Sequence, residues 1–174
     1  MKRVALMFPG QGSQGVGMAR DFYDEYEEVR KLFEKANRLL DKDIKSLIFE
    51  GPEETLTETE HTQPALLLVS TAIHQLLEKE GIEPVMAVGH SLGEYSALTA
   101  AGSLSFDQAL PLVATRGKLM EEAFPKGQGT MAAVLGLSAE EIEAGLKEVK
   151  EEVVDMANLN CPGQIVISGS KQGV

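Results

Sequence analysis

The chain has 174 residues, 43% of them hydrophobic, and a formal net charge of −11. That length suits one domain, or one domain with a small appendage. The negative charge argues against nucleic acid or an anionic membrane as the main partner, and no segment is long enough to span a bilayer. The single cysteine, Cys161, excludes an internal disulfide framework and is expected to be a small buried side chain in a reducing compartment. The first apolar run is too short for a signal peptide, so we expect a cytoplasmic protein.

A short apolar run from Val4 to Phe8 predicts a buried first strand. The segment after it, residues 10–15, formally matches the G-x-G-x-x-G pattern of dinucleotide-binding loops. That pattern requires a second strand and an acidic residue about 20 positions further on. Residues 21–40 instead predict one amphipathic helix, and Glu50 comes too late to contact a ribose. The apolar positions of this predicted helix are Phe22, Tyr26, Val29, Phe33, Ala36 and Leu40.

The glycines of this loop are better explained as giving a turn the conformational freedom that lets Gln11 and its backbone approach a substrate. Glutamine suits an oxyanion hole because its amide donates a hydrogen bond without carrying charge. A loop that is simply rich in glycine is the alternative.

A further helix is predicted from Thr62 to about Lys79, with Pro64 in its first turn, where a missing N–H costs nothing. Apolar residues cover much of its circumference, so we expect it to be well buried. His74 lies among them and is expected to be a packing residue. His61 lies in the preceding loop, with no partner visible in the sequence.

Residues 85–101 carry the most specific chemical pattern. Residues 85–88 predict a buried strand, residues 94–101 predict a helix, and Gly-His-Ser-Leu-Gly at 89–93 matches the G-x-S-x-G motif of a nucleophile elbow. Such a turn strains the backbone of Ser91, and its glycines leave room for neighbouring backbone. At the helix N-terminus, N–H groups including that of Leu92 can stabilise an oxyanion. His90 is expected to be structural, because a neighbour on the turn generally cannot swing its ring onto the hydroxyl. An ordinary serine in a glycine-rich turn is the alternative.

The next helix is predicted to begin with a capping box from Ser105 to Gln108. It carries Arg116 on a largely apolar surface, which calls for an acid or a substrate anion as partner, a structural salt bridge being the commoner case. Residues 124–129 predict a linker. Beyond them the pattern predicts a strand at 130–135, a helix capped by Ser138, and strands at 153–157 and 164–168. This β-α-β-β order lacks the last helix and strand of a split β-α-β sandwich.

Five separated motifs occur in the chain: FPGQGSQ at 8–14, TQPA at 62–65, GHSLGEYSA at 89–97, RGK at 116–118 and NCPGQ at 160–164. In order and spacing they resemble the malonyl-CoA:acyl-carrier-protein transacylase family of fatty-acid synthesis, over the whole chain. The resemblance implies an α/β fold. An α/β-hydrolase-like domain with a parallel sheet would span residues 1–125, and a small ferredoxin-like α+β subdomain, incomplete in this chain, would span residues 126–174.

The resemblance also implies roles for particular residues. Ser91 would be the nucleophile that malonyl-CoA acylates, and the backbone of Gln11 and Leu92 would hold the oxyanion. Arg116 would pair with the free carboxylate of malonate, which favours malonyl over acetyl groups. His90 and Gln63 would line the substrate pocket. The phosphopantetheine thiol of acyl carrier protein would then take the malonyl group, in a ping-pong reaction.

The resemblance implies no metal and no permanently bound cofactor, coenzyme A thioester being the substrate. Its implied partners are malonyl-CoA, acyl carrier protein and the chain's own missing C-terminal portion. The family's general-base histidine follows the small subdomain and is absent here, so we expect an N-terminal part of a longer enzyme, weak or inactive alone. Two other functions stay open: a serine esterase or thioesterase, and a non-catalytic fragment that binds acyl carrier protein.

Overall fold

The computed structural model describes residues 3–123 and 127–174. The chain divides into two compact units, Met1–Glu121 and Glu122–Val174. The predicted linker at 124–129 lies in part outside the described residues, which lack 124–126. In the parts of the chain that are described, no helix is both long and apolar enough to cross a membrane.

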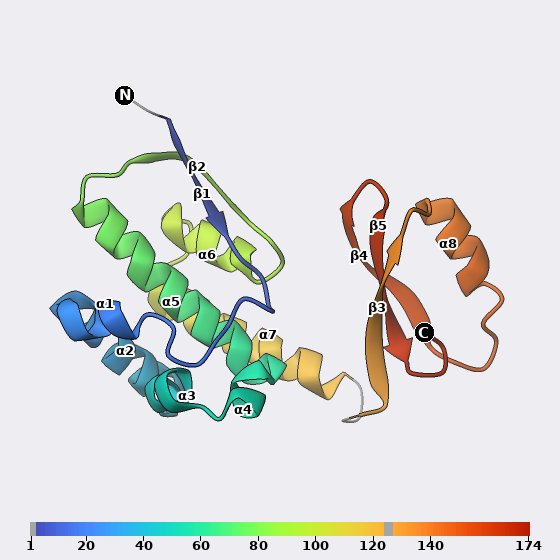
Figure 1. The fold of residues 1–174 in the computed structure, drawn as a ribbon, viewed down its shortest axis with the longest axis horizontal. Coiled ribbons are helices and arrows are strands. Elements are labelled where there is room, and N and C mark those ends of the chain that lie inside the picture. The colour runs from blue at the N-terminus through green and yellow to red at the C-terminus, as the bar shows by residue number, and fades with distance from the viewer. Residues whose placement is uncertain (1–2, 124–126) are drawn as a thin grey trace. The chain divides into compact units, whose positions relative to one another are not determined.

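The first unit is built around two parallel strands that are far apart in the sequence (Figure 1). Its elements in chain order are β1 (Val4–Phe8), α1 (Arg20–Glu25), α2 (Glu27–Leu40), α3 (Ile44–Glu50), α4 (Glu53–Thr57), α5 (Thr59–Lys79), β2 (Pro84–Gly89), α6 (Gly93–Ala100) and α7 (Phe106–Glu122). The chain runs through helices α1–α5 before it returns to the sheet, so residues 10–15 do not open the β-α-β unit that dinucleotide binding requires.

The prediction of one helix over residues 21–40 is wrong, because two helices meet at Tyr26, whose backbone is extended (φ −109°, ψ 124°). The guanidinium of Arg30 donates hydrogen bonds to the backbone carbonyl oxygens of Tyr23 and Asp24, both at 2.9 Å. These bonds satisfy carbonyl groups at the end of α1 that a continuous helix would have used internally. The predicted apolar face nonetheless packs inward from α2, where Val29, Phe33 and Ala36 are buried.

The predicted start of α5 at Thr62 is also wrong, because the helix begins at Thr59 and contains Pro64 in its interior. The N–H of Thr59 donates to a carboxylate oxygen of Glu121 at 3.0 Å. This contact from α7 satisfies one of the free N–H groups of the first turn, which lets the helix start earlier than the local sequence indicates.

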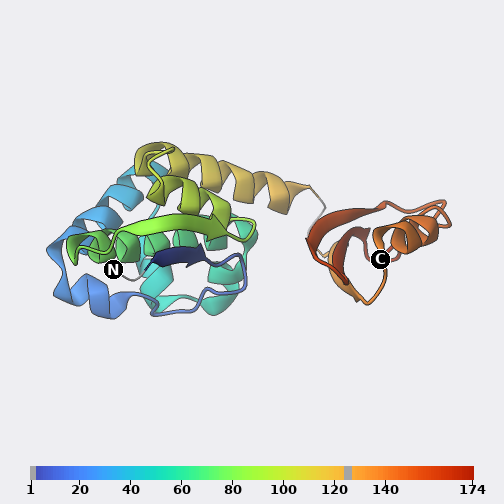
Figure 2. The same ribbon diagram turned by 90° about the horizontal axis from the view of Figure 1, so that it is seen from above.

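The core of the first unit lies between α5 and the helices around it (Figure 2). Phe33 of α2 stacks on Phe49 of α3 with 5.2 Å between ring centroids, and Tyr23 meets both rings edge-on. Leu67 and Leu68 of α5 are fully buried. This helical core fixes α5, whose first turns carry residues of the candidate site.

The sheet confirms the two predicted strands but not their burial. The parallel register pairs Ala5 with Met86 and Met7 with Val88. Met7 is 82% exposed and Met86 58% exposed. Helix α6 contacts both strands, and α5 lies beside α6. The expectation of buried strands fails because helices of this unit cover the sheet from one side, as Figure 1 shows.

The second unit is a three-stranded antiparallel sheet with one helix. Its elements are β3 (Gly129–Leu135), α8 (Ala139–Leu146), β4 (Val154–Cys161) and β5 (Gln164–Ser170), and the strand order is β3-β5-β4. The predicted cap of α8 is confirmed, since Ser138 and Glu141 form both bonds of a capping box. Cys161 is exposed, not buried as expected, because it ends β4 opposite Gln164 at a tight turn. With its parallel and antiparallel sheets the chain has a mixed α/β fold.

Candidate active site

Ser91 lies on a strained turn between the end of β2 and the start of α6. Its φ is +51°, in the left-handed region, where a residue with a side chain costs about 1–2 kcal/mol. A β-carbon on Gly89 would lie 1.9 Å from the carbonyl carbon of Gly93, and one on Gly93 would lie 2.3 Å from the carbonyl oxygen of Phe8. No side chain fits at either position. The two glycines are therefore needed for the turn, as the elbow pattern predicts.

The loop after β1 packs against this turn. The N–H of His90 donates to the carbonyl oxygen of Phe8 at 3.1 Å. A β-carbon on Gly10 would lie 2.7 Å from Nδ1 of His90. The contacts explain why glycine follows Pro9, and they bring the backbone of Gln11 to the same end of the sheet as Ser91.

Two backbone N–H groups remain available at this end of the sheet. Leu92 is buried at the N-cap of α6, and Gln11 follows β1. Among the hydrogen bonds of the described residues, none is donated by the N–H of either residue. The side-chain amide of Gln11 donates instead to Oγ1 of Thr59 at 3.2 Å. The side-chain amide of Gln11, which the sequence suggested as a donor to an oxyanion, is thus already hydrogen-bonded to Thr59. The backbone N–H of Gln11 is the group that could still donate.

Arg116 of α7 reaches the side chain of Ser91. Its Nη2 donates to Oγ of Ser91 at 3.1 Å, and its Nη1 donates to Oε1 of Gln63 at 2.7 Å. The guanidinium also lies 5.7 Å from the ring centroid of Tyr95. Within the described residues no carboxylate pairs with Arg116. A half-buried cation surrounded by neutral groups is suited to bind an anion. The structural salt bridge considered from sequence is not observed within residues 3–123 and 127–174.

A close crossing of α7 over the start of α5 positions this arginine. A β-carbon on Gly117 would lie 2.7 Å from the carbonyl oxygen of Thr59, so the two helices meet backbone to backbone there. Gln63 is fully buried, and its Nε2 lies 3.3 Å from Sδ of Met120. Both the nitrogen and the oxygen of its amide therefore face α7, and the oxygen accepts the hydrogen bond from Arg116.

The structure brings together Ser91, Arg116 and Gln63, and places His90, Gln11 and Leu92 around the same turn. Sequence reasoning missed Tyr95, Met120 and the crossing at Gly117. Met120 lies four residues after Arg116 on the same face of α7, so the helical period could have indicated that both approach the same neighbour.

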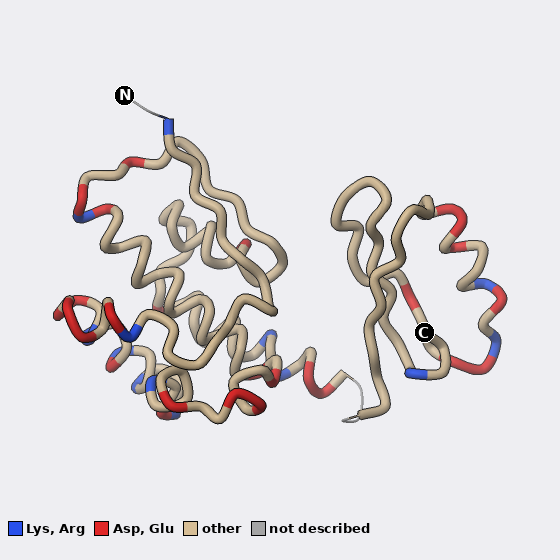
Figure 3. Tube along the Cα trace, in the orientation of Figure 1, with Lys and Arg blue, Asp and Glu red and all other residues tan. Residues whose placement is uncertain are grey.

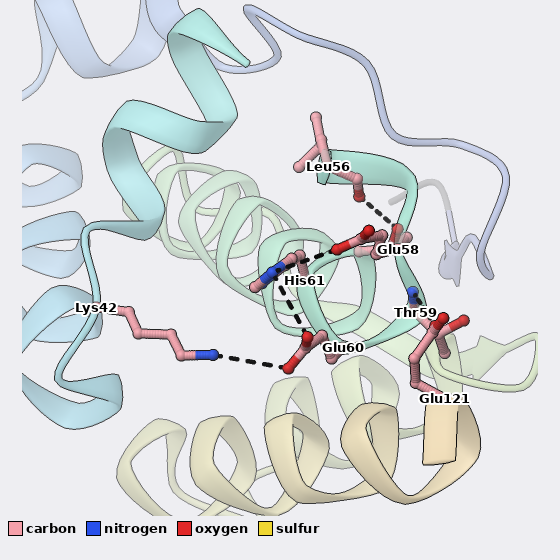
Figure 4. A network of polar contacts seen from close by, with 8 residues as sticks. Lys42, Leu56, Glu58, Thr59, Glu60, His61 and Glu121 are labelled. Carbon is pink, nitrogen blue, oxygen red and sulfur yellow. Dashed lines mark hydrogen bonds and ion pairs between the residues drawn. The ribbon is translucent and has the colours of Figure 1, made fainter. Parts of the chain in front are cut away.

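A second polar group lies at the start of α5, beside a cavity of about 310 Å³ (Figure 4). Nε2 of His61 is 3.8 Å from carboxylate oxygens of both Glu58 and Glu60, and Nζ of Lys42 is 3.7 Å from the other oxygen of Glu60. In the described residues, Glu58, Glu60 and His61 form the one group of histidine and carboxylates close enough to share a metal ion. Lys42 offsets part of the negative charge of the two glutamates at the first turn of α5. None of the predicted site residues lines the cavity.

The fold and site define an α/β protein that presents a serine on a strand-turn-helix elbow beside an arginine. Residues 5–174 match the family described as acyl transferase domain, and the chain belongs to that family. It is 50% identical over 176 residues to the malonyl CoA-acyl carrier protein transacylase of Bacillus subtilis, with all of this chain and 56% of that protein covered.

Solved structures agree with this membership. An acyl carrier protein S-malonyltransferase from Vibrio cholerae superposes with a TM-score of 0.87 and 45% identity, covering 99% of this chain and 57% of that one. A malonyl-transacylase in complex with its type II PKS acyl-carrier protein superposes equally well, at 45% identity and 56% of its length. The chain thus spans little more than half the length of these relatives and corresponds to their N-terminal portion.

Proposed function

We propose that this chain is the nucleophile-bearing part of an enzyme that transfers a malonyl group from malonyl-CoA to acyl carrier protein. The observation that carries the proposal is the pair formed by Ser91 and Arg116. The hydroxyl sits on an elbow, and a guanidinium without a carboxylate partner in the described residues lies 3.1 Å from it. The similarity to malonyl transacylases supplies the identity of the acyl group and its donor.

In the first half-reaction Oγ of Ser91 attacks the thioester carbonyl carbon of malonyl-CoA. The oxygen of that carbonyl gains charge and is held by the N–H groups of Gln11 and Leu92, at the N-terminus of α6. The carbon–sulfur bond breaks, coenzyme A leaves with the proton taken from the serine, and a malonyl ester of Ser91 remains. Arg116 binds the free carboxylate with two parallel hydrogen bonds, and Gln63 keeps the guanidinium oriented.

In the second half-reaction the phosphopantetheine thiol of acyl carrier protein attacks the ester, and Ser91 recovers its proton. A serine needs a general base in both halves. Neither His61 nor His74 serves, because the first faces Glu58 and Glu60 and the second lies 3.6 Å from a carboxylate oxygen of Glu78. The family resemblance puts the base in the portion of the relatives that this chain does not span. The chain alone is then weak or inactive.

We also propose that residues 126–174 are the first part of a ferredoxin-like subdomain. The order β3-β5-β4, with α8 between β3 and β4, is the order of the first three strands of that fold. In the described sheet β3 has a partner on one side only, so a fourth strand would add beside it. This division puts the subdomain boundary close to the end of α7.

Denaturing intact-mass spectrometry with malonyl-CoA tests the proposal. We expect the mass of one malonyl group on the chain when the C-terminal remainder of the Bacillus subtilis relative is co-expressed with it, and loss of that adduct in Ser91→Ala. Little or no adduct is expected without the remainder. Release of free malonate as fast as transfer to a thiol would indicate a serine esterase or thioesterase. Binding of acyl carrier protein that survives Ser91→Ala, without any adduct, would indicate a non-catalytic fragment.

A further inference from the structure

Thr59 contacts two other segments of the first unit at once. Its Oγ1 accepts a hydrogen bond from Nε2 of Gln11 at 3.2 Å, and its N–H donates to a carboxylate oxygen of Glu121 at 3.0 Å. A β-carbon on Gly117 would lie 2.7 Å from its carbonyl oxygen. The loop after β1, the first turn of α5 and the helix that carries Arg116 therefore meet at one residue.

The loop after β1 gives Gln11 little restraint of its own. Glycines flank it on both sides, and Gly12 has a positive φ of 106°. Glycine leaves the backbone more conformational freedom than any other residue. Residues 4–19 contain no charged residue, as Figure 3 shows, so no ion pair can fix this segment. Neutral hydrogen bonds therefore supply the restraint.

Two side-chain hydrogen bonds act on this turn. The N–H of Gly12 donates to Oε1 of Gln14 at 2.8 Å, which closes the turn on itself. The bond from Gln11 to Thr59 instead joins the turn to a helix, across 48 positions of the chain. The first bond shapes the turn, and the second fixes its place relative to α5.

The two ends of a malonyl group would be bound by different segments. Under the proposed function, the N–H groups of Gln11 and Leu92 hold the oxygen of the reacting carbonyl, and Arg116 holds the free carboxylate. Because the acyl group is short, these groups must keep fixed positions relative to Ser91. Leu92 follows Ser91 directly, and Arg116 donates to its hydroxyl at 3.1 Å. Gln11 lies in a loop outside both elements and needs a link of its own.

We propose that Thr59 is a positioning residue for the oxyanion hole. Its hydroxyl holds the side chain of Gln11 and thereby aims the backbone N–H of Gln11 at the oxygen of the reacting carbonyl. Its contacts with Glu121 and Gly117 fix that N–H relative to the helix that carries Arg116. The inference rests on the proposed function, in which Gln11 stabilises the oxyanion.

Thr59→Val tests this role, because valine keeps the branched shape of threonine and removes the acceptor. The variants are made in the two-chain complex of this chain with the co-expressed C-terminal remainder of the Bacillus subtilis relative. Single-turnover acylation of Ser91 at saturating malonyl-CoA should slow by roughly threefold to tenfold, a modest factor because the bond is exposed to water. The affinity for malonyl-CoA, titrated in a Ser91→Ala background, should stay unchanged, since Arg116 keeps its contacts.

Three further variants serve as controls. Thr59→Ser keeps the hydroxyl and should restore the unmodified rate. Thr57→Val, at the exposed end of α4, is the matched control and should react like the unmodified complex. Gln11→Ala removes the same bond from its other end and keeps the backbone N–H, so it should slow acylation by a similar factor. Combining it with Thr59→Val should cost no more than either change alone, because both remove one interaction.

A readout that does not depend on catalysis accompanies the kinetics. With this chain isotopically labelled for NMR, the order parameter of the Gln11 amide should fall below about 0.6 in Thr59→Val and keep its unmodified value in Thr59→Ser. An unchanged order parameter in Thr59→Val would overturn the proposal, as would additive losses in the double variant or a matching loss of malonyl-CoA affinity. A Gln11 amide loosened by Thr59→Val in a complex that never acylates Ser91 would support the link to Thr59 and count against the proposed function alone.

Discussion

Nη2 of Arg116 lies 3.1 Å from Oγ of Ser91, so a cation on α7 holds the hydroxyl of the elbow between β2 and α6. The same guanidinium is anchored by Gln63 on its other nitrogen. A substrate with a free carboxylate can take over the bond that the hydroxyl now accepts. An acyl group without a carboxylate leaves the arginine on the serine. Under the proposed function, binding of the substrate carboxylate to Arg116 would thus free the hydroxyl of Ser91 from its present hydrogen bond.

Arg116→Ala should weaken malonyl-CoA binding by roughly tenfold to a hundredfold, the range for losing hydrogen bonds to a charged group. Acetyl-CoA binding should stay nearly unchanged, because the acetyl group offers no carboxylate. Isothermal titration of both thioesters onto the two-chain complex measures the difference. Equal losses for the two would mean that Arg116 does not contact the acyl group.

Gln63→Glu should form an ion pair with Arg116 in place of the present neutral hydrogen bond of 2.7 Å. The new carboxylate competes with that of malonate, so malonyl-CoA binding should fall by about tenfold or more while the fold is kept. Gln63→Leu should lower binding less, because the cation stays free but loses its orientation.

Titration of both Gln63 variants with malonyl-CoA, alongside circular dichroism to verify folding, separates positioning from packing. Binding by Gln63→Glu that matches the unmodified chain would show that Arg116 does not meet the substrate carboxylate.

Gly93→Ala should prevent correct folding of the elbow, because its β-carbon would lie 2.3 Å from the carbonyl oxygen of Phe8. The expected loss exceeds about 3 kcal/mol, since backbone would have to move on both sides. Gly15→Ala is the control within the same unit, as its β-carbon meets nothing within 4 Å and its φ is not positive. Urea unfolding of both variants measures the contrast. Similar midpoints would indicate that the turn relaxes without cost.

Asp43 should stabilise the chain in a pH-dependent way. Its carboxylate accepts hydrogen bonds from Oγ and N–H of Ser46, at 2.7 and 3.1 Å, and from Nδ2 of Asn37 at 2.8 Å. These bonds, with that of the Ser46 hydroxyl first, lower the pKa of Asp43. A group with a lowered folded pKa contributes stability above its unfolded pKa, and the contribution is lost as the pH falls through the folded pKa.

Asp43→Ala should therefore cost about 1 kcal/mol at pH 7, the usual value of a helix N-cap, and progressively less as the pH falls below the ordinary pKa of an aspartate. Urea unfolding across that range provides the measurement. Ser46→Ala should have a smaller effect, and the double variant should cost less than the two single variants together, because they share one interaction. A constant difference across the pH range would show that the carboxylate charge has no part in the cap.

Local patterns in the sequence predicted the elements whose stabilising contacts lie within a few residues of one another in the chain. The elbow at 89–93, the capping boxes at Ser105 and Ser138, and the strands of both sheets follow from such patterns and are present. The failures come from distant contacts. Arg30 ends α1 at Tyr26, and Glu121 starts α5 at Thr59, across 62 positions of the chain.

The candidate site follows the same division. Ser91 and its glycines are recognisable from one short motif, because the turn that needs them is local. The partnership of Arg116 with Gln63 spans 53 positions and depends on the helix crossing at Gly117, which no local pattern encodes. The burial of β1 and β2 was predicted wrongly. An apolar run indicates that a strand is suited to a protein interior, but it does not indicate whether the same chain supplies the residues that cover the strand.

The left-handed backbone of Ser91 has a consequence for how this chain tolerates change. Replacing the serine by alanine removes the hydroxyl and keeps the unfavourable φ of +51°, whereas replacing it by glycine removes both. Ser91→Gly should thus be more stable than Ser91→Ala by about 1 kcal/mol, the reverse of their order at most positions. Position 91 is therefore one at which the fold itself would favour glycine, and a serine there lowers the stability of the chain.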